Sequence, residues 1–306
     1  MTDSMFAAPG RFFRGNLHTH SDRSDGALSA EDVCRRYKAQ GYDFIALTDH
    51  FIGLFDYPIT DTSAYRDNRF TTILGAELHS GAMQNGEIWH ILAVGLPMDF
   101  APSNAPHFQP LEDQESGPEI AARAREAGAF VAVAHPQWSS MLLEDARSIE
   151  AAHAVEIYNH GCGVSADRAD GLHTLDLLLS EGRKLTLCAT DDAHFSEPDA
   201  FGGWVMVKAQ ENAPDSLLQA LKDGHFYSSQ GPEFHNITWN EKTVDVESSA
   251  VARVILQGQG PRTESLHGES ITRTHIQVGR LEPSPWLRVT IIDHAGRRAW
   301  CNPVWR

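Results

Sequence analysis

The stretch HTHSDRSDG, residues 18–26, begins at the end of the strand candidate 13–18. Side chains two residues apart on a strand point to the same face, so His18 and His20 can bind one ion together. Asp25 follows them in the turn made by SDG. A pair of histidines alone is weak evidence for a metal site, but this longer stretch combines three ligand-type side chains at the end of one predicted strand.

Other histidines and carboxylates occupy similar places, within or just after short apolar runs. They are His50 in FIALTDH, Glu77 in ILGAEL, His90 in EIWHILAVG, His135 in FVAVAHP, and Asp192 and His194 in LTLCATDDAH. Imidazole and carboxylate are ligands that Zn, Mn and Fe share. A catalytic zinc takes about three protein ligands. The larger set therefore predicts two or three divalent ions that share a bridging carboxylate.

Strand-like and helix-like segments alternate through the first two-thirds of the chain. The strand candidates are 13–18, 43–48, 71–77, 88–95, 129–134, 154–158 and 184–190, and the helix candidates are 30–40, 118–128, 142–152, 166–182 and 214–224. Nearly continuous apolar runs are typical of parallel strands buried on both faces. Strand ends that carry ligands converge on one face of a β/α barrel. We therefore predict an α/β fold with a seven-stranded barrel.

The pattern changes after about residue 225. The runs FHNITWN, VARVILQG, THIQVGR and LRVTIIDHAG are short and separated by turns, which predicts a small antiparallel β region. We expect a barrel domain over 1–224 and a β-rich region over 225–306. Tyr227 and Ser228 lie in a turn-rich junction, where they either approach the pocket or only pack as part of a linker. The loop-like segments 51–70 and 97–117 either cover the site or are surface insertions.

Composition limits the classes of partner. The net charge of -16 argues against a long nucleic-acid groove, whereas a cation-filled pocket suits a small anionic substrate. No apolar stretch reaches the ~18 residues of a membrane span. The chain start lacks the pattern of a signal peptide, and the four cysteines show no paired spacing. We expect a cytoplasmic protein with reduced thiols, and the sequence leaves its oligomeric state open.

The motifs together resemble the PHP superfamily, named for polymerase and histidinol phosphatase domains. They occur in the family's order, as HTH with SDG at 18–26, ALTDH at 46–50, GAE at 75–77, HILAVGL at 90–96, VAHP at 133–136 and DDAH at 191–194. The resemblance covers roughly residues 13–195. It implies a distorted (β/α)7 barrel, a trinuclear metal site and phosphoesterase activity.

The resemblance also implies how the ligands are shared among three ions. The first ion would be held by His18, His20, Glu77 and Asp192, the second by Glu77, His90 and His135, and the third by Asp25, His50 and His194. Glu77 would bridge the first two ions. The expected nucleophile is a hydroxide that bridges two ions and attacks phosphorus in line.

Other residues have less determined roles. Arg23 is the preferred cation for phosphate. Tyr158, Asn159 and His160, where EIYNH ends a strand at the expected active face, are candidates for contact with the substrate. Asp25, His194 or metal-bound water can act as acid or base. The remaining polar residues near the motifs have these expected roles: Asp49 orients an imidazole or only ends a strand, Asp191 and Glu156 are structural or support ligands, and His79 is less favoured as a ligand than His90.

The leading hypothesis is a hydrolase of a small phosphomonoester, nucleotide or short oligonucleotide. A metal-dependent hydrolase of a carbon-centred bond and a non-catalytic metal-binding module are the alternatives. The first alternative would be favoured by a carboxylated lysine, and no lysine lies at a suitable strand end. All three require Glu77 to lie well within ~10 Å of His18 and His135, since metal–ligand bonds are about 2 Å long.

Overall fold

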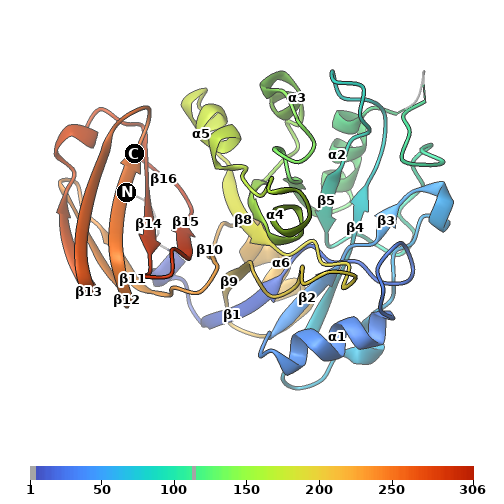
Figure 1. Ribbon diagram of the computed structural model, residues 1–306, viewed down its shortest axis with the longest axis horizontal. Helices are drawn as coiled ribbons and strands as arrows, with labels where there is room; N and C mark the ends of the chain where they lie inside the picture. The colour runs from blue at the N-terminus through green and yellow to red at the C-terminus, as the bar shows by residue number, and fades with distance from the viewer. Residues whose placement is uncertain (1–4, 112–114) are drawn as a thin grey trace.

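A computed structural model describes residues 5–111 and 115–306 (Figure 1). All seven predicted strands are present and form consecutive neighbours in one sheet. They are β1 (Arg11–Asn16), β2 (Phe44–Leu47), β4 (Thr71–Leu78), β5 (Ile91–Val94), β6 (Phe130–Val133), β7 (Ala154–Asn159) and β8 (Thr186–Thr190), and the short β3 (His50–Phe51) pairs with β4. The predicted α/β fold with its C-terminal antiparallel region is confirmed.

One strand runs against the predicted direction. β5 pairs antiparallel with both β4 and β6, whereas the other predicted neighbours pair in parallel. Every residue of β5 is buried, and a strand buried on both faces has the same apolar pattern in either direction. The reversal puts the start of β5, where His90 lies, at the sheet edge where the parallel strands end.

An eighth strand completes this part of the sheet. β9 (Trp204–Ala209) was not predicted, and it pairs antiparallel with β1. The ladder does not close between β8 and β1, but the chain segments after these two strands meet in a parallel bridge between Thr19 and Ala193. The amide of Asp192 donates to the carbonyl of His18 over 2.8 Å at the same place. The HTH motif at 18–20 and the DDAH motif at 191–194 are therefore held side by side, although they are far apart in the sequence.

The helices follow the predicted alternation with one correction. They are α1 (Ala30–Ala39), α2 (Gly117–Glu126), α3 (Leu143–Ser148), α4 (His160–Ala166), α5 (Leu172–Ser180) and α6 (Pro214–Lys222), with short 3-10 turns at Met5–Ala7, Gly53–Phe55, Ser63–Tyr65 and Gly279–Leu281. The predicted helix over 166–182 was wrong in extent. Asp167 takes a left-handed conformation with φ of 56° and ends α4, so that α5 begins only at Leu172.

The C-terminal strands extend the sheet on the side of β9. β10 (Phe226–Ser229) pairs with β9 and with β15 (Arg298–Cys301), and the sheet continues through β14 (Trp286–Ile292), β12 (Thr243–Gly258) and β11 (Phe234–Trp239), with β13 (Thr263–Gln277) and β16 (Val304–Trp305) beside them. Figure 1 shows these strands as a separate orange-to-red group beside the barrel strands. The expected boundary between residues 224 and 225 stays a prediction.

The predicted junction at Tyr227 and Ser228 is a buried strand, not a turn. Tyr227 packs against Phe234 and Phe12 with ring centroids 5.3 and 5.2 Å apart. The Ser228 hydroxyl accepts from the amide of Ala189 in β8 over 3.0 Å. These residues therefore join the two parts of the chain instead of approaching the cavity described below.

His153, between β6 and β7, makes stability depend on pH. Burial, Arg125 and Lys222 lower the pKa of His153 from 6.5 to about 4, and its Nδ1 accepts from the amide of Val131 over 3.1 Å. The unfolded chain binds more protons between these two pH values, so stability falls as pH drops from 6.5 to 4. Allowing for its partial exposure, we expect a loss of about 1–2 kcal/mol that His153→Gln removes. Urea unfolding at pH 7 and 4.5 tests this, and parallel profiles for the two proteins would contradict it.

Within the described ranges, no helix is both long and apolar enough to cross a bilayer. Cys34, Cys162, Cys188 and Cys301 are buried as free thiols.

Candidate metal centre

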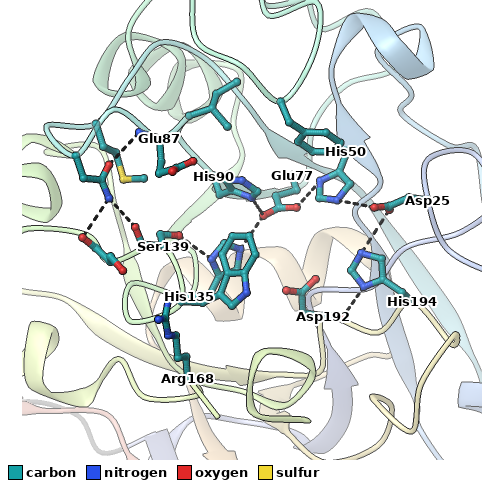
Figure 2. A pocket seen from close by; sticks show the side chains of 16 residues that line it. Asp25, His50, Glu77, Glu87, His90, His135, Ser139, Arg168, Asp192 and His194 are labelled. Carbon is teal, nitrogen blue, oxygen red and sulfur yellow. Dashed lines mark hydrogen bonds and ion pairs between the residues drawn. The ribbon is translucent and has the colours of Figure 1, made fainter. Parts of the chain in front are cut away.

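The ligand-type side chains come from separate strand ends and meet at one edge of the barrel sheet. His18 and His20 follow β1, His50 begins β3, and Glu77 lies in β4. The other members lie next to strand ends or in the adjoining loops: Asp25 after β1, His90 before β5, His135 after β6, and Asp192 and His194 after β8. Figure 2 shows Glu77 between His90 and His50, with Asp192 and His194 beside them.

Glu77 lies at the centre of the cluster, and its two carboxylate oxygens face different histidines. Oε1 is 2.8 Å from Nδ1 of His90 and 3.0 Å from Nε2 of His135. Oε2 is 2.7 Å from Nδ1 of His50 and 3.6 Å from Nε2 of His18. This arrangement meets the distance condition stated above. A carboxylate with histidines around both oxygens can serve two ions at once.

Two further groups adjoin Glu77. Oδ1 of Asp192 lies 2.9 Å from Nε2 of His20 and 3.2 Å from Nε2 of His18. Asp25 lies between two histidines, 3.4 Å from Nε2 of His50 and 3.4 Å from Nε2 of His194. The ligand atoms of His20 also lie within 4.8 Å of the Asp25 group, so this group has four members instead of the three expected.

His79 belongs to the cluster more closely than predicted. Its Nδ1 donates to the carbonyl of Trp89 over 3.0 Å, which leaves Nε2 free to face Nδ1 of His50 at 2.9 Å. Together with Glu77 and His90, these two histidines form a group whose ligand atoms could hold an ion. The sequence places His79 just after β4 and His90 just before β5, and only the fold shows that both are within reach.

Several buried atoms in the cluster make no hydrogen bond of suitable geometry among the described residues, although charged groups lie close to them. They are Nε2 of His18, Nδ1 of His20 and Oε2 of Glu77. A buried polar atom without a partner costs about 1–3 kcal/mol, so such atoms call for an explanation. A divalent cation accepts lone pairs from imidazole nitrogen and carboxylate oxygen. The residues present therefore fit a metal site.

Histidines and carboxylates in the cluster shift each other's pKa values in opposite directions. Burial opposes protonation of His50 and His194, but neighbouring carboxylates outweigh it and raise the pKa of His50 to about 10 and that of His194 to about 9. Burial likewise opposes ionisation of Glu77 and Asp192, but the surrounding histidines hold the pKa of both carboxyls well below the usual range. The site is a set of anionic carboxylates that attract protons or metal cations.

Glu156 accepts hydrogen bonds from the segments that carry His18 and His135. Its Oε1 accepts from Nδ1 of His18 over 2.9 Å, which turns Nε2 of His18 toward the cluster. Its Oε2 accepts from the amide of His135 over 2.7 Å and from Nδ2 of Asn159 over 2.9 Å. Asn159 also donates to Oδ2 of Asp192 over 3.0 Å. Glu156 and Asn159 thus orient candidate metal ligands. Asn159 was expected to contact the substrate, but it is not among the residues that line the cavity.

Glu156→Gln is expected to weaken metal binding about 10- to 100-fold while the chain still folds. A glutamine amide cannot accept hydrogen bonds at both of its ends, so either His18 or the His135–Asn159 side loses its acceptor. Titration of metal-free protein with Zn²⁺ or Mn²⁺ measures the affinity, and circular dichroism checks the fold. An unchanged affinity would show that Glu156 only fills space.

Two ligand residues have positive φ angles, 21° at His135 and 53° at Asp192. Such conformations cost about 1–3 kcal/mol in residues other than glycine and persist where the surroundings impose them. The amide of His135 donates a hydrogen bond to Glu156, and the amide of Asp192 donates one to the carbonyl of His18. These two hydrogen bonds supply that constraint. Strain at two ligands fits a site under functional constraint.

Asp49 and Asp191 organise backbone and hydroxyl groups. Asp49 accepts from the amide of Ser21 over 2.7 Å and from the hydroxyls of Ser24 and Thr60, so it holds the loop of residues 18–26. All of its hydrogen bonds here come from amide and hydroxyl donors, so the expected imidazole contact finds no support. Asp191 accepts from the hydroxyl of Tyr37 over 2.7 Å and from three backbone amides, which is the structural role expected for it.

A cavity of about 770 Å³ opens over the cluster. Its lining includes Arg168 but not Arg23, which is exposed on the loop. Arg168 follows α4 and was missed, because nothing in its local sequence points to a site. Tyr158 lines a second cavity of about 270 Å³ beside Trp300, and its hydroxyl is 2.9 Å from Nδ1 of His160. The structure therefore does not bring Arg23, Tyr158 or His160 to the main cavity.

The loop 97–117, apart from residues 112–114, which lie outside the described residues, partly covers the cluster. Phe108 lines the cavity, and its ring centroid is 4.8 Å from that of His50. Trp138, in the loop after β6, lines the opening with its ring centroid 5.0 Å from that of His135. Of the two possibilities for this loop, covering the site is therefore the one observed.

Comparison with known proteins supports this description. A model of the PHP domain family matches residues 16–192, and no curated protein matches the chain. A two-domain protein from Bacteroides vulgatus that contains a predicted PHP-like metal-dependent phosphoesterase is similar in structure over 90% of both chains, with 18% identity and a TM-score of 0.51.

Two further solved structures match a smaller part of the chain. One is an amidohydrolase from Chromobacterium violaceum with bound sulfate and no metal, which has 16% identity and a TM-score of 0.46 over 60% of this chain and 89% of its own. The other, described as a candidate metal-dependent phosphoesterase, is from Bifidobacterium adolescentis, with 15% identity and a TM-score of 0.42 over 61% and 90%.

Proposed function

Because the chain belongs to the PHP domain family, we propose that it is a metal-dependent phosphoesterase that hydrolyses a small phosphate ester at a trinuclear site. The position of Glu77 carries this proposal. Its two buried oxygens lie 2.7–3.0 Å from ring nitrogens of His90, His135 and His50, and no backbone or hydroxyl donor among the described residues satisfies Oε2. A structural carboxylate would be satisfied by backbone or hydroxyl donors, as Asp191 is.

The proposed division of the three ions is the one that the family resemblance implies, and the groups whose ligand atoms lie within 4.8 Å of one another overlap with it only in part. The first would be held by His18, His20, Glu77 and Asp192, the second by Glu77, His90 and His135, and the third by Asp25, His50 and His194. His79 is an additional candidate beside His50. Zn, Mn and Fe all suit this mixture of nitrogen and oxygen ligands. When bound, such ions supply Lewis acidity that activates water and screens charge on the phosphate oxygens.

The chain contributes positioning and proton transfer. Arg168 lines the cavity and has no side-chain partner within the described ranges, so its guanidinium is free to bind a phosphate oxygen. Asp25 and His194 are the more exposed members of the cluster, at 41% and 26% of their side-chain surface, and both line the cavity. They are therefore, together with metal-bound water, the candidates for proton exchange with the leaving oxygen, and a residue that binds the third ion would act through that water.

Assays of the metal-loaded protein test the proposal. Protein freed of metal with a chelator and reloaded with Zn²⁺, Mn²⁺ or Fe²⁺ is tested against small phosphomonoesters, nucleotides and phosphodiesters. We expect hydrolysis that disappears with the chelator and returns with at least one ion. Absence of turnover on every ester, in protein shown to contain metal, would contradict the proposal. Turnover of an amide or lactone instead would favour hydrolysis of a carbon-centred bond.

A further inference from the structure

The outer half of the cavity has a different chemistry from its floor. Phe108 and Trp138 both line it, although 37% and 39% of their surfaces are exposed. The two rings flank the same ligand: the ring centroid of His90 is 6.4 Å from that of Phe108 and 5.5 Å from that of Trp138. Exposed aromatic surface beside a metal-type cluster is costly unless something covers it.

An exposed carboxylate lines the same cavity as these rings. Glu87 lines the cavity, and its side chain has no partner among the described residues. Asn85 accepts from the amide of Glu87 over 3.0 Å and donates to the carbonyl of Ser139 over 2.8 Å. The turn that carries Glu87 is therefore tied to the loop that carries Trp138.

The cavity is lined by side chains of opposite charge, Glu87 and Arg168. In the view of Figure 2, Glu87 and Arg168 lie on opposite sides of His135. A phosphate group is attracted to Arg168 and to the cation site but repelled by the free carboxylate of Glu87. The part of a substrate that extends past His90 therefore meets two aromatic faces and an anion.

We propose that this outer half is a leaving-group subsite, lined by Phe108, Trp138 and Glu87, for a planar aromatic ring that carries hydrogen-bond donors or positive charge. The inference rests on the proposed function and makes it more specific. In the reaction the oxygen of water bonds to phosphorus, the ester P–O bond breaks, and the leaving oxygen takes a proton. The ring departs as an alcohol or phenol. Glu87 disfavours a second anionic group on that ring.

Matched esters test the subsite. Benzyl phosphate and cyclohexylmethyl phosphate differ in ring character, and 4-(aminomethyl)benzyl phosphate and 4-carboxybenzyl phosphate differ in charge. We expect kcat/KM of the metal-loaded protein to favour the aromatic over the saturated ester, and the cationic over the anionic ester, by about tenfold or more. Phe108→Ala and Trp138→Ala should lower the first ratio toward one. Glu87→Gln should lower the second ratio and leave the first unchanged.

Controls separate this inference from the proposed function. Leu142→Ala, another exposed apolar position that does not line the cavity, should change neither ratio. Binding of benzylphosphonate, which is not hydrolysed, is measured by calorimetry on the metal-loaded variants. Hydrolysis of all four esters at equal rates would overturn the subsite and leave the function standing. If these four esters and every ester of the assay described under the proposed function stay intact, while phosphonate binding still depends on Phe108 and Trp138, the function is overturned and the subsite is supported.

Discussion

Glu77→Gln is expected to lower phosphoesterase activity by roughly 10³-fold or more, because Lewis-acid stabilisation worth several kcal/mol is lost with the ions. A neutral amide offers one oxygen where the carboxylate offers two, and the histidines around the other end lose their shared anion. We expect the metal content to fall by at least one ion per chain. Elemental analysis of protein purified in parallel with the wild type measures this directly.

The change at Glu77 needs a matched control, because any substitution at a fully buried residue can disturb folding. Glu144→Gln alters an exposed glutamate of α3 in the same way and should keep full activity and metal content. Circular dichroism must show that both variants are folded. Full activity in folded Glu77→Gln protein would remove the basis of the proposed bridging role.

Asp176→Ala is expected to lower the free energy of unfolding by about 3 kcal/mol, which is the largest stability effect that we predict outside the metal centre. Arg288 in β14 is almost fully buried, and its Nη2 donates to both oxygens of Asp176 in α5 over 2.9 and 2.8 Å. Without the carboxylate, the guanidinium stays buried with a bond to Gln257 as its main remaining contact. Urea unfolding monitored by tryptophan fluorescence gives the change.

A double replacement distinguishes loss of the ion pair from loss of packing. Asp176→Leu combined with Arg288→Met removes both charges and keeps apolar volume, so it should recover most of the lost stability. If the single and double variants are equally destabilised, the bond between α5 and the C-terminal strands is not the cause. Because Asp176 and Arg288 lie outside the metal cluster, metal content should stay unchanged in both.

The sequence alone was sufficient for most of the barrel. The seven strand candidates all lie within a few residues of observed strands, because each is a short apolar run between turn or helix signals. The proposed ligands lie next to such runs, so convergence of strand ends brings Glu77 near His18 and His135 without further information. The break after Ala166 was missed, since a single residue in a left-handed conformation has no periodic pattern to reveal it.

The candidate ligands and their order along the chain could therefore be read from local sequence, because apolar strands leave most of their polar groups at or near their ends. Tertiary structure decided the direction of β5 and the closeness of His79 to His50. It also decided the positions of four residues around the cavity, Arg168, Phe108, Trp138 and Glu87. A strand buried on both faces carries no signal of direction, and loop residues have no periodicity. Their places depend on packing between segments that are distant in the chain.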